Sequence, residues 1–450
     1  MRLENVTISS FSLSQCTRLK ELTLDNVNVG DSKLDLSGAS RLSQLGLENI
    51  TVSGFSLSQC TRLKELTLEN VNLGDGKLDL SNASHLSQMR LENVTISSFS
   101  LSQCTRLKEL TLDNVNVGDG KLDLSGASRL SQLGLENITV SGFSLSQCTR
   151  LEELTLENVN LGDGKLNLSG ASHLSQLRLE NVTVSSFILP ECTQLKELTL
   201  KNANIVDGKL DLSCASCLSQ LRLKKVTTSS VSLSQCTQLE KLTMENVNLG
   251  DGKLELSGAS RLSQLRLKNV NISSFSLLHC TQLDELKLKN VNLGDGKLDL
   301  SGASCLSQIW LEKLMISSLC LSKCTQLKYM TLKNVKLGDG KLDLSGASCL
   351  SQLGLENITV SGFSLSQCTR LKELTLDNVN VGDGKLDLSG ASRLSQLGLE
   401  NITVSGFSLS QCTRLEELTL ENVNLGDGKL NLSGASHLSQ LRLENVTVSS

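Results

Sequence analysis

The 450-residue chain carries 43 Lys and Arg against 47 Asp and Glu, a formal net charge of −4, and only 2% of its residues are aromatic. This balance provides no global basic field that would recruit nucleic acid, and no stretch reaches the roughly 20 consecutive apolar residues that a membrane helix needs. The first residues, Met1–Asn5, lack the apolar segment of a signal peptide. With so few aromatic side chains, the core has to be built from Leu, Val and Ile.

A 44-residue unit runs through the whole chain without insertion or deletion. A fixed period of this length predicts a solenoid, in which each coil buries its apolar face only against its neighbours. The unit is marked by one cysteine, which recurs at Cys16, Cys60, Cys104, Cys148, Cys192, Cys236, Cys280, Cys324, Cys368 and Cys412.

Each unit contains two coils of different length. The stretch Leu19–Val29 reads LxxLxLxxVxV, and Leu42–Val52 reads LxxLxLxxIxV. The coil starts Leu13, Leu36 and Leu57 are 23 and then 21 residues apart, which together make the 44-residue period. We therefore expect about 20 coils in a single array that spans residues 1–450.

The residue pattern within each coil predicts strands rather than helices. In Leu22–Asp25 apolar and polar residues alternate, so leucines point inward while Thr23 and Asp25 point outward. These short strands are expected to pair in parallel on a concave face. After a turn at Gly30, the return leg Lys33–Leu36 alternates again, and coils this short leave room only for extended or 3₁₀ segments on the convex face.

The LxxLxLxxVxV pattern resembles the leucine-rich repeat, and the resemblance covers the whole chain. It implies an α/β-type repeat solenoid, here mostly β and loop, with a parallel sheet on the concave face. The family usually has Asn or Cys at the ninth position, where this chain has Val27 or Ile50, and asparagine stands one place earlier, at Asn26 or Asn49. We expect the turn after the strand to be hydrogen-bonded in another way than by the family's internal asparagine ladder.

The 15 cysteines do not indicate a disulfide framework. Neighbouring rungs lie about 5 Å apart, so equivalent cysteines two coils apart are separated by about 10 Å, beyond the roughly 7 Å between Cα atoms that a disulfide tolerates. The ten equivalent cysteines are expected to be small, buried and free. The lone CxxC of Cys214 and Cys217 has no second pair, so we expect no metal or cofactor site, and the free thiols favour a reducing compartment.

Long identical segments point to recent duplication. Met1–Asp31 is identical to Met89–Asp119, and Phe99–Ser186 is identical to Phe363–Ser450. Neither end shows the altered sequence with which solenoids usually cap their cores. We interpret the chain as a fragment with uncapped ends, which are expected to associate end to end.

One outward column of the predicted sheet changes charge along the array. It is acidic at both ends and mostly basic in the middle, where the only tryptophan and the only tyrosine of the chain also lie. Aromatic residues flanked by cations on a rigid sheet are suited to a protein-binding hot spot, here for an acidic ligand; the alternative is that the middle repeats have simply drifted. The candidate residues form what we call the central patch: Arg222, Lys224, Arg266, Lys268, Lys287, Lys289, Trp310, Tyr329 and Lys333.

The sequence favours a binding protein over an enzyme or a nucleic-acid-binding protein. None of the four histidines, of which His279 is one, stands with a serine, cysteine or carboxylate in a pattern that suggests a catalytic triad. The resemblance implies a non-catalytic protein-binding scaffold, of the kind that forms the sensing region of cytoplasmic NACHT-type innate immune receptors. Two alternatives remain open: an extracellular adhesion or receptor ectodomain, which glycosylation motifs such as Asn49-Ile50-Thr51 favour, and a substrate adaptor.

Overall fold

The computed structural model describes residues 1–31, 33–52, 56–74, 76–97, 100–118, 120–141, 144–162, 164–189, 192–205, 209–250, 252–338, 340–382, 384–405, 408–426 and 430–447. Contacts between Cα atoms divide the chain into two compact units. The first comprises Met1–Leu218 and Lys224–Thr228, and the second comprises Ser219–Leu223 and Ser229–Ser450.

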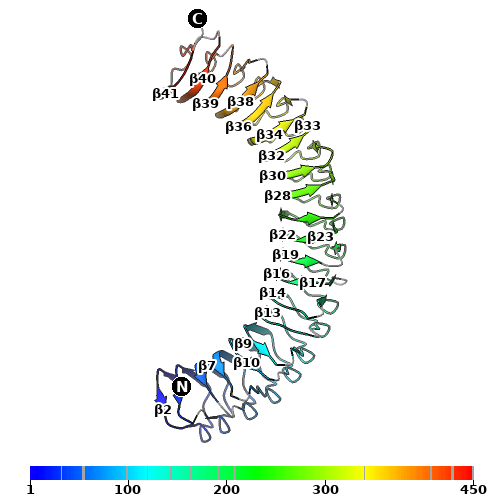
Figure 1. Cartoon of the computed structure of the whole chain (residues 1–450), viewed down its shortest axis with the longest axis vertical. Coiled ribbons are helices and arrows are strands. Elements are labelled where there is room, and N and C mark those ends of the chain that lie inside the picture. Colours follow the sequence, from blue (N-terminus) through cyan, green and yellow to red (C-terminus); the bar gives the residue numbers. More distant parts are fainter. Residues whose placement is uncertain are drawn as a thin grey trace. The chain divides into compact units, whose positions relative to one another are not determined.

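Both units are parallel β-solenoids, and no helix occurs in the described part of the chain. Each coil contributes one strand to a parallel sheet, and in Figure 1 these strands lie side by side along each unit. In the first unit they are β1 (Arg2–Glu4), β4 (Glu21–Asp25), β7 (Gln44–Thr51), β8 (Glu65–Asn72), β9 (Gln88–Glu92), β11 (Glu109–Asp113), β13 (Gln132–Glu136), β14 (Glu153–Glu157), β16 (Gln176–Glu180) and β19 (Glu197–Lys201). In the second they are β25 (Lys241–Glu245), β28 (Gln264–Ile272), β30 (Glu285–Leu293), β32 (Gln308–Ile316), β34 (Tyr329–Leu337), β36 (Gln352–Val360), β38 (Glu373–Val381), β39 (Gln396–Thr403), β40 (Glu417–Asn424) and β41 (Gln440–Glu444). The residues of β22 (Gln220–Lys224) are divided between the two units.

Shorter strands continue each coil beyond the sheet. Directly after the sheet strand lie β2 (Thr7–Ile8), β5 (Asn28–Val29), β10 (Thr95–Ile96), β12 (Asn116–Val117), β17 (Thr183–Val184), β20 (Asn204–Ile205), β23 (Thr227–Thr228) and β26 (Asn248–Leu249). The return legs carry β3 (Phe11–Ser12), β6 (Leu34–Asp35), β15 (Lys165–Asn167), β18 (Ser186–Ile188), β21 (Lys209–Asp211), β24 (Ser230–Ser232), β27 (Lys253–Glu255), β29 (Ser274–Phe275), β31 (Lys297–Asp299), β33 (Ser318–Cys320), β35 (Lys341–Leu342) and β37 (Gly362–Phe363). The extended return leg expected from the sequence is therefore present.

The core follows from the alternation of apolar and polar residues. In β4 the two leucines, Leu22 and Leu24, are 1% and 0% exposed, whereas Thr23 between them lies on the outer side of the sheet. The register sets like against like, because Leu22 pairs with Leu45 and Leu24 with Leu47. Each inward position is thus a ladder of aliphatic side chains, and each outward position is a column of polar ones.

Each coil has one left-handed residue, and this explains the displaced asparagine; the residue lies directly after a short sheet strand, as Asn26 does after β4, or inside a longer one, as Asn269 does in β28. Twenty-one non-glycine residues of the described chain have positive φ angles, all close to +50°. All are asparagines except Lys225 and Lys313. Asparagine tolerates this region better than most residues because its short side chain hydrogen-bonds locally.

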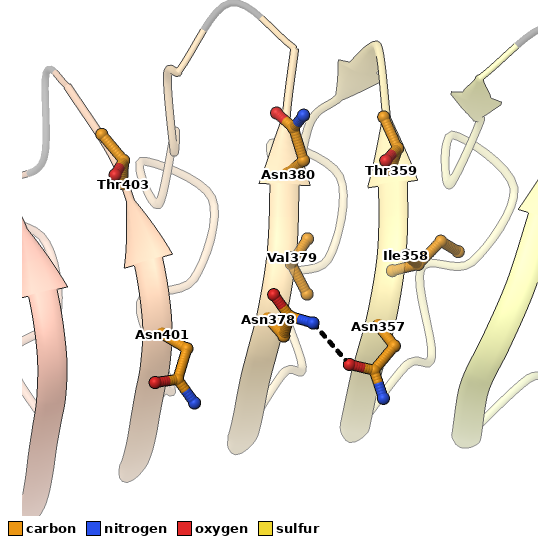
Figure 2. A pocket seen from close by; sticks show the side chains of 8 residues that line it. All are labelled: Asn357, Ile358, Thr359, Asn378, Val379, Asn380, Asn401 and Thr403. Carbon is orange, nitrogen blue, oxygen red and sulfur yellow. Dashed lines mark hydrogen bonds between the residues drawn. The ribbon is translucent and has the colours of Figure 1, made fainter.

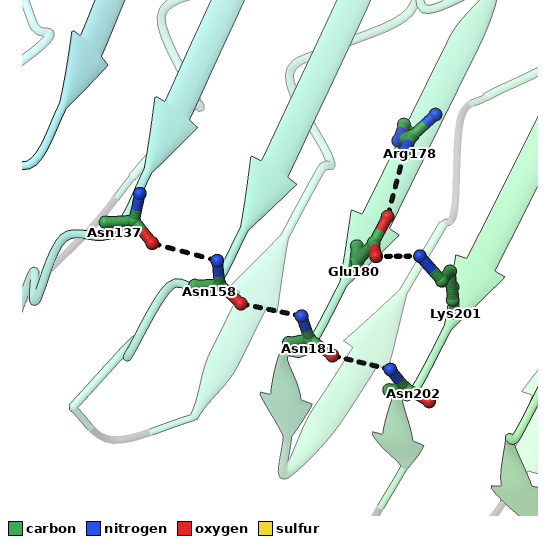
Figure 3. Close-up of polar contacts among 7 residues, drawn as sticks. All are labelled: Asn137, Asn158, Arg178, Glu180, Asn181, Lys201 and Asn202. Carbon is green, nitrogen blue, oxygen red and sulfur yellow. Dashed lines mark hydrogen bonds and ion pairs between the residues drawn. The ribbon is translucent and has the colours of Figure 1, made fainter.

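The side chains of these asparagines form a ladder on the outside of the coil. Asn158 donates its Nδ2–H to Oδ1 of Asn137 at 2.8 Å, Asn181 donates to Asn158 at 2.6 Å, and Asn202 donates to Asn181 at 2.7 Å (Figure 3). The same bond recurs in the second unit, for example from Asn290 to Asn269 at 2.8 Å. The chain therefore has an exposed asparagine ladder, one residue before the position that the leucine-rich repeat usually uses.

Substitutions at Asn290 should separate the contribution of its side-chain amide to stability from the contribution of its left-handed backbone. Replacement by glycine removes the amide but keeps the left-handed backbone, which glycine adopts freely. Replacement by alanine removes the amide and also places a β-carbon in this region, which costs about 1–2 kcal/mol. Urea denaturation should therefore find N290A less stable than N290G by about that amount; equal stabilities would contradict the backbone explanation.

The cysteine prediction holds for all but one of the ten equivalent residues. Nine of them are buried and are in no disulfide: Cys60, Cys104, Cys148, Cys192, Cys236, Cys280, Cys324, Cys368 and Cys412. The prediction is wrong for Cys16, which is exposed, since it lies in the first complete coil and a complete coil covers it on one side only.

Candidate functional site

The two aromatic residues of the central patch lie on neighbouring strands of the second unit. Trp310 on β32 and Tyr329 on β34 are 41% and 43% exposed. The register places Trp310 opposite Thr331 and Tyr329 opposite Gln308, so the two rings are diagonal neighbours on the outer side of the sheet. The two rings thus form an exposed aromatic pair on an otherwise polar face of the sheet.

The cations of the central patch surround these rings on the same sheet. Lys287 on β30 is directly opposite Trp310, and Lys333 lies on β34 with Tyr329. Arg266 and Lys268 on β28 pair in register with Lys287 and Lys289. The remaining predicted residues, Arg222 and Lys224, lie on β22.

Glu285, a residue that the sequence analysis did not single out, holds two of these cations. Its carboxylate accepts hydrogen bonds from Nε and Nη2 of Arg266 at 3.2 and 2.9 Å, and it forms an ion pair with Nζ of Lys287 at 2.9 Å. Burial acts to raise the pKa of Glu285, but the hydrogen bonds from Arg266 and Lys287 outweigh it and the pKa is lowered. Both cations are thus held in defined positions on the sheet, which reduces the side-chain entropy that a ligand would have to freeze.

Glu312 has the same role beside the tryptophan. Lys289 Nζ lies 3.0 Å from its carboxylate, and this hydrogen bond is the main cause of the lowered pKa of Glu312, to which a hydrogen bond from Trp310 also contributes. Lys333 pairs with Glu356 at 2.8 Å on the next strand. These ion pairs could have been found in the sequence, because they join opposite charges at register-paired positions, such as Lys289 and Glu312.

These ion pairs compensate most of the charge on the outer face, since Lys268 is also paired with Glu245, and the remaining positive charge of these strands comes largely from Lys313 and Lys336. Strands β28, β30, β32 and β34 together carry seven Lys and Arg residues and two glutamates, a net charge of +5. The following strands β36, β38, β39 and β40 carry no Lys or Arg and six Asp or Glu residues, a net charge of −6. The second unit therefore presents a positive, aromatic surface that adjoins a negative one.

The sheet of the first unit is acidic in the corresponding column. Asp25, Glu48 and Glu69 are direct register partners on β4, β7 and β8. The charge of Asp25 is the largest cause of the raised pKa of Glu48, followed by burial and by the charge of Glu69. At Glu180 the negative charge of this column is compensated by cations, because Glu180 pairs with Arg178 at 2.8 Å and with Lys201 (Figure 3).

A shallow polar groove follows the asparagine ladder in the second unit. Its volume is about 540 Å³, and Figure 2 shows its lining on three neighbouring strands, β36, β38 and β39. The lining consists of Asn357, Ile358, Thr359, Asn378, Val379, Asn380, Asn401 and Thr403. The exposed side chains are amides and hydroxyls, which can form hydrogen bonds but do not suggest a catalytic constellation.

No group of three or more His, Cys, Asp or Glu side chains among the described residues could hold a metal ion. No helix long and apolar enough to cross a bilayer is found among them either.

No protein-family model matches the chain, and no curated protein matches it. Among solved structures it is similar to YopM from Yersinia enterocolitica WA-314, at 17% identity and a TM-score of 0.58, over 97% of this chain and 89% of that one. It is also similar to the plant peptide hormone receptor RGFR1 in complex with RGF2, at 16% identity and a TM-score of 0.57, over 100% of this chain and 80% of that one. The LRR protein LIC12759 from Leptospira interrogans matches at 16% identity and a TM-score of 0.46, over 87% of each chain. The first two matches establish the fold as a solenoid of the leucine-rich-repeat type.

Proposed function

We propose that this chain is a non-catalytic protein-recognition module, and that its ligand binds the outer side of the sheet in the second unit, at the part of the central patch on strands β28 to β34. The observation that carries the proposal is the exposed pair Trp310 and Tyr329 on strands whose net charge is +5. Binding hot spots are enriched in Trp, Tyr and Arg and are surrounded by contacts that exclude water. The ion pairs of Glu285 and Glu312 hold the surrounding cations in place before a ligand arrives.

We further propose that the module is the ligand-sensing region of an intracellular innate immune receptor. The support comes from its free thiols, which suit a reducing compartment, and from the resemblance of its repeats to those of such receptors. The alternative, an extracellular receptor, is favoured by one observation. The asparagines of the glycosylation motifs, such as Asn49 and Asn93, are exposed.

Site-directed photo-crosslinking tests the proposal. A benzophenone side chain in place of Thr331 lies beside both aromatic rings, and one in place of Ser301, an exposed residue on the opposite side of the coil, is the matched control. We expect a discrete protein adduct from position 331 and none from position 301 when the chain is expressed in the cytosol. Replacing Trp310 and Tyr329 with alanine should weaken binding at least about 30-fold, since each hot-spot truncation typically costs about 2 kcal/mol or more.

Two results would contradict the proposal. One is that adducts form equally from both positions, and the other is that they persist in the double alanine variant. Either result would show that the ligand does not bind at the central patch. Formation of the adduct only when the chain is directed into the secretory pathway would support the extracellular receptor instead.

A further inference from the structure

The strand with the tryptophan is also the described strand of the second unit in which the left-handed asparagine is replaced. Lys313 takes the left-handed position there, with φ of 56°. Two residues later, Met315 occupies the position of Thr359 in β36 and is 71% exposed. The C-terminal part of β32 therefore lacks the amide and the hydroxyl that, at the equivalent positions of β36, line the groove shown in Figure 2.

A second apolar side chain is uncovered beside Met315. Leu337, at the end of β34, is half-buried, whereas the equivalent residues Ile316 and Val360 on the strands before and after it are 1% and 0% exposed. The register places Met315 opposite Lys336 and Ile316 opposite Leu337, so Met315 and Leu337 lie at the ends of adjacent strands with their side chains on opposite faces. The two residues form what we call the apolar edge. Methionine is a flexible, polarisable side chain that adapts to varied partners.

The charges at this edge differ from those on the face of the sheet. Lys313 and Lys336 flank the apolar edge and form no ion pair with any described residue, although Glu312 lies next to Lys313 in the chain. On the face, in contrast, Lys289 and Lys333 are each paired with a glutamate. Much of the uncompensated positive charge of these four strands thus lies beside Met315 and Leu337.

We propose that an acidic, extended polypeptide segment of the partner runs along β32, from Trp310 on the outer face of the sheet to Met315 near the C-terminal end of the strand. Its carboxylates contact Lys313 and Lys336, and an apolar side chain between them rests on Met315. At roughly 3.3 Å per residue, the five residue steps from Trp310 to Met315 span at most about 17 Å, which six extended ligand residues would cover. This inference rests on the proposed function and adds to it the chemistry and the course of the ligand.

The surroundings favour a short acidic peptide over a nucleic acid. A long polyanion that continued along the sheet towards its C-terminal strands would meet β36 to β40, whose net charge is −6. A peptide that crosses the sheet along β32 avoids them. Met315 in turn needs an aliphatic side chain, which a phosphate backbone does not have.

Fluorescence of Trp310 provides a direct assay, because it is the only tryptophan in the chain. The probe is a peptide of alternating glutamate and leucine, compared with one of alternating lysine and leucine and with oligothymidine. We expect saturable, salt-sensitive fluorescence change with the glutamate peptide alone. In the triple variant K313N/M315T/K336N, which introduces the residues that β36 and β38 carry at these positions, the affinity should fall at least tenfold.

The triple variant should keep the fold, because Asn357, Thr359 and Asn380 already occupy the equivalent positions in regular strands. The charge-matched control K64N/K108N changes two exposed lysines of the first unit and should bind as the unmodified chain does. Unchanged affinity of the triple variant would overturn the inference, and so would equal binding of the lysine peptide or of oligothymidine. Failure of the glutamate peptide together with a Trp310-dependent adduct at position 331 would overturn this inference and leave the proposed function standing.

Discussion

Replacing Leu288 with alanine should lower the free energy of unfolding of the second unit by about 2–5 kcal/mol. The side chain is 0% exposed and lies in the ladder between Leu267 and Leu311 on the two neighbouring strands. The substitution leaves a cavity that the two neighbouring strands cannot fill, because the hydrogen bonds of the sheet fix their positions. In a solenoid each coil contacts only its neighbours, so one cavity weakens two interfaces at once.

Urea denaturation followed by circular dichroism and by Trp310 fluorescence measures this loss. The matched control is T375A, an exposed position on the outer side of the same sheet, for which a change within about 0.5 kcal/mol is expected. Equal losses in the two variants would show that the leucine ladder does not carry the stability of the unit.

Raising the pH from 9 to 11 should destabilise the chain through its buried thiols. Burial raises the pKa of Cys60, Cys104, Cys148, Cys280, Cys324, Cys368 and Cys412 from 9.0 to about 11. Below pH 9 these thiols are protonated in both the folded and the unfolded chain, so their contribution to stability is complete. Between pH 9 and 11 the unfolded thiols ionise while the folded ones remain neutral, so the free energy of unfolding falls, and above pH 11 the loss levels off.

A variant with alanine at these seven positions isolates the effect from the titration of lysines and tyrosine. Alanine is the residue that the alternate coils carry at the same place, as at Ala303, which is 0% exposed. The urea midpoint of this variant should fall less between pH 9 and 11 than that of the unmodified chain. Identical pH profiles would show that the thiols ionise without penalty in the folded state.

Much of the candidate site could be predicted from the sequence because the repeat is regular. A coil of constant length gives every residue a fixed inward or outward direction, so the leucine ladders and the columns of the sheet follow from the spacing alone. The same regularity placed Trp310 and Tyr329 on adjacent strands, which the register now shows as diagonal neighbours. End-to-end association of the chain stays a prediction.

The sequence by itself thus determined the solenoid, the direction of each side chain and the position of the aromatic pair, since these depend only on the period. The tertiary structure decided what each outward side chain contacts. The double ion pair of Glu285 with Arg266 and Lys287 depends on the reach of long side chains between neighbouring strands. The asparagine ladder depends on a left-handed backbone in each coil, and the uncovered Leu337 depends on the side chains of the neighbouring coils. Such contacts join residues about 20 positions apart in the chain, beyond the range over which a local pattern constrains geometry.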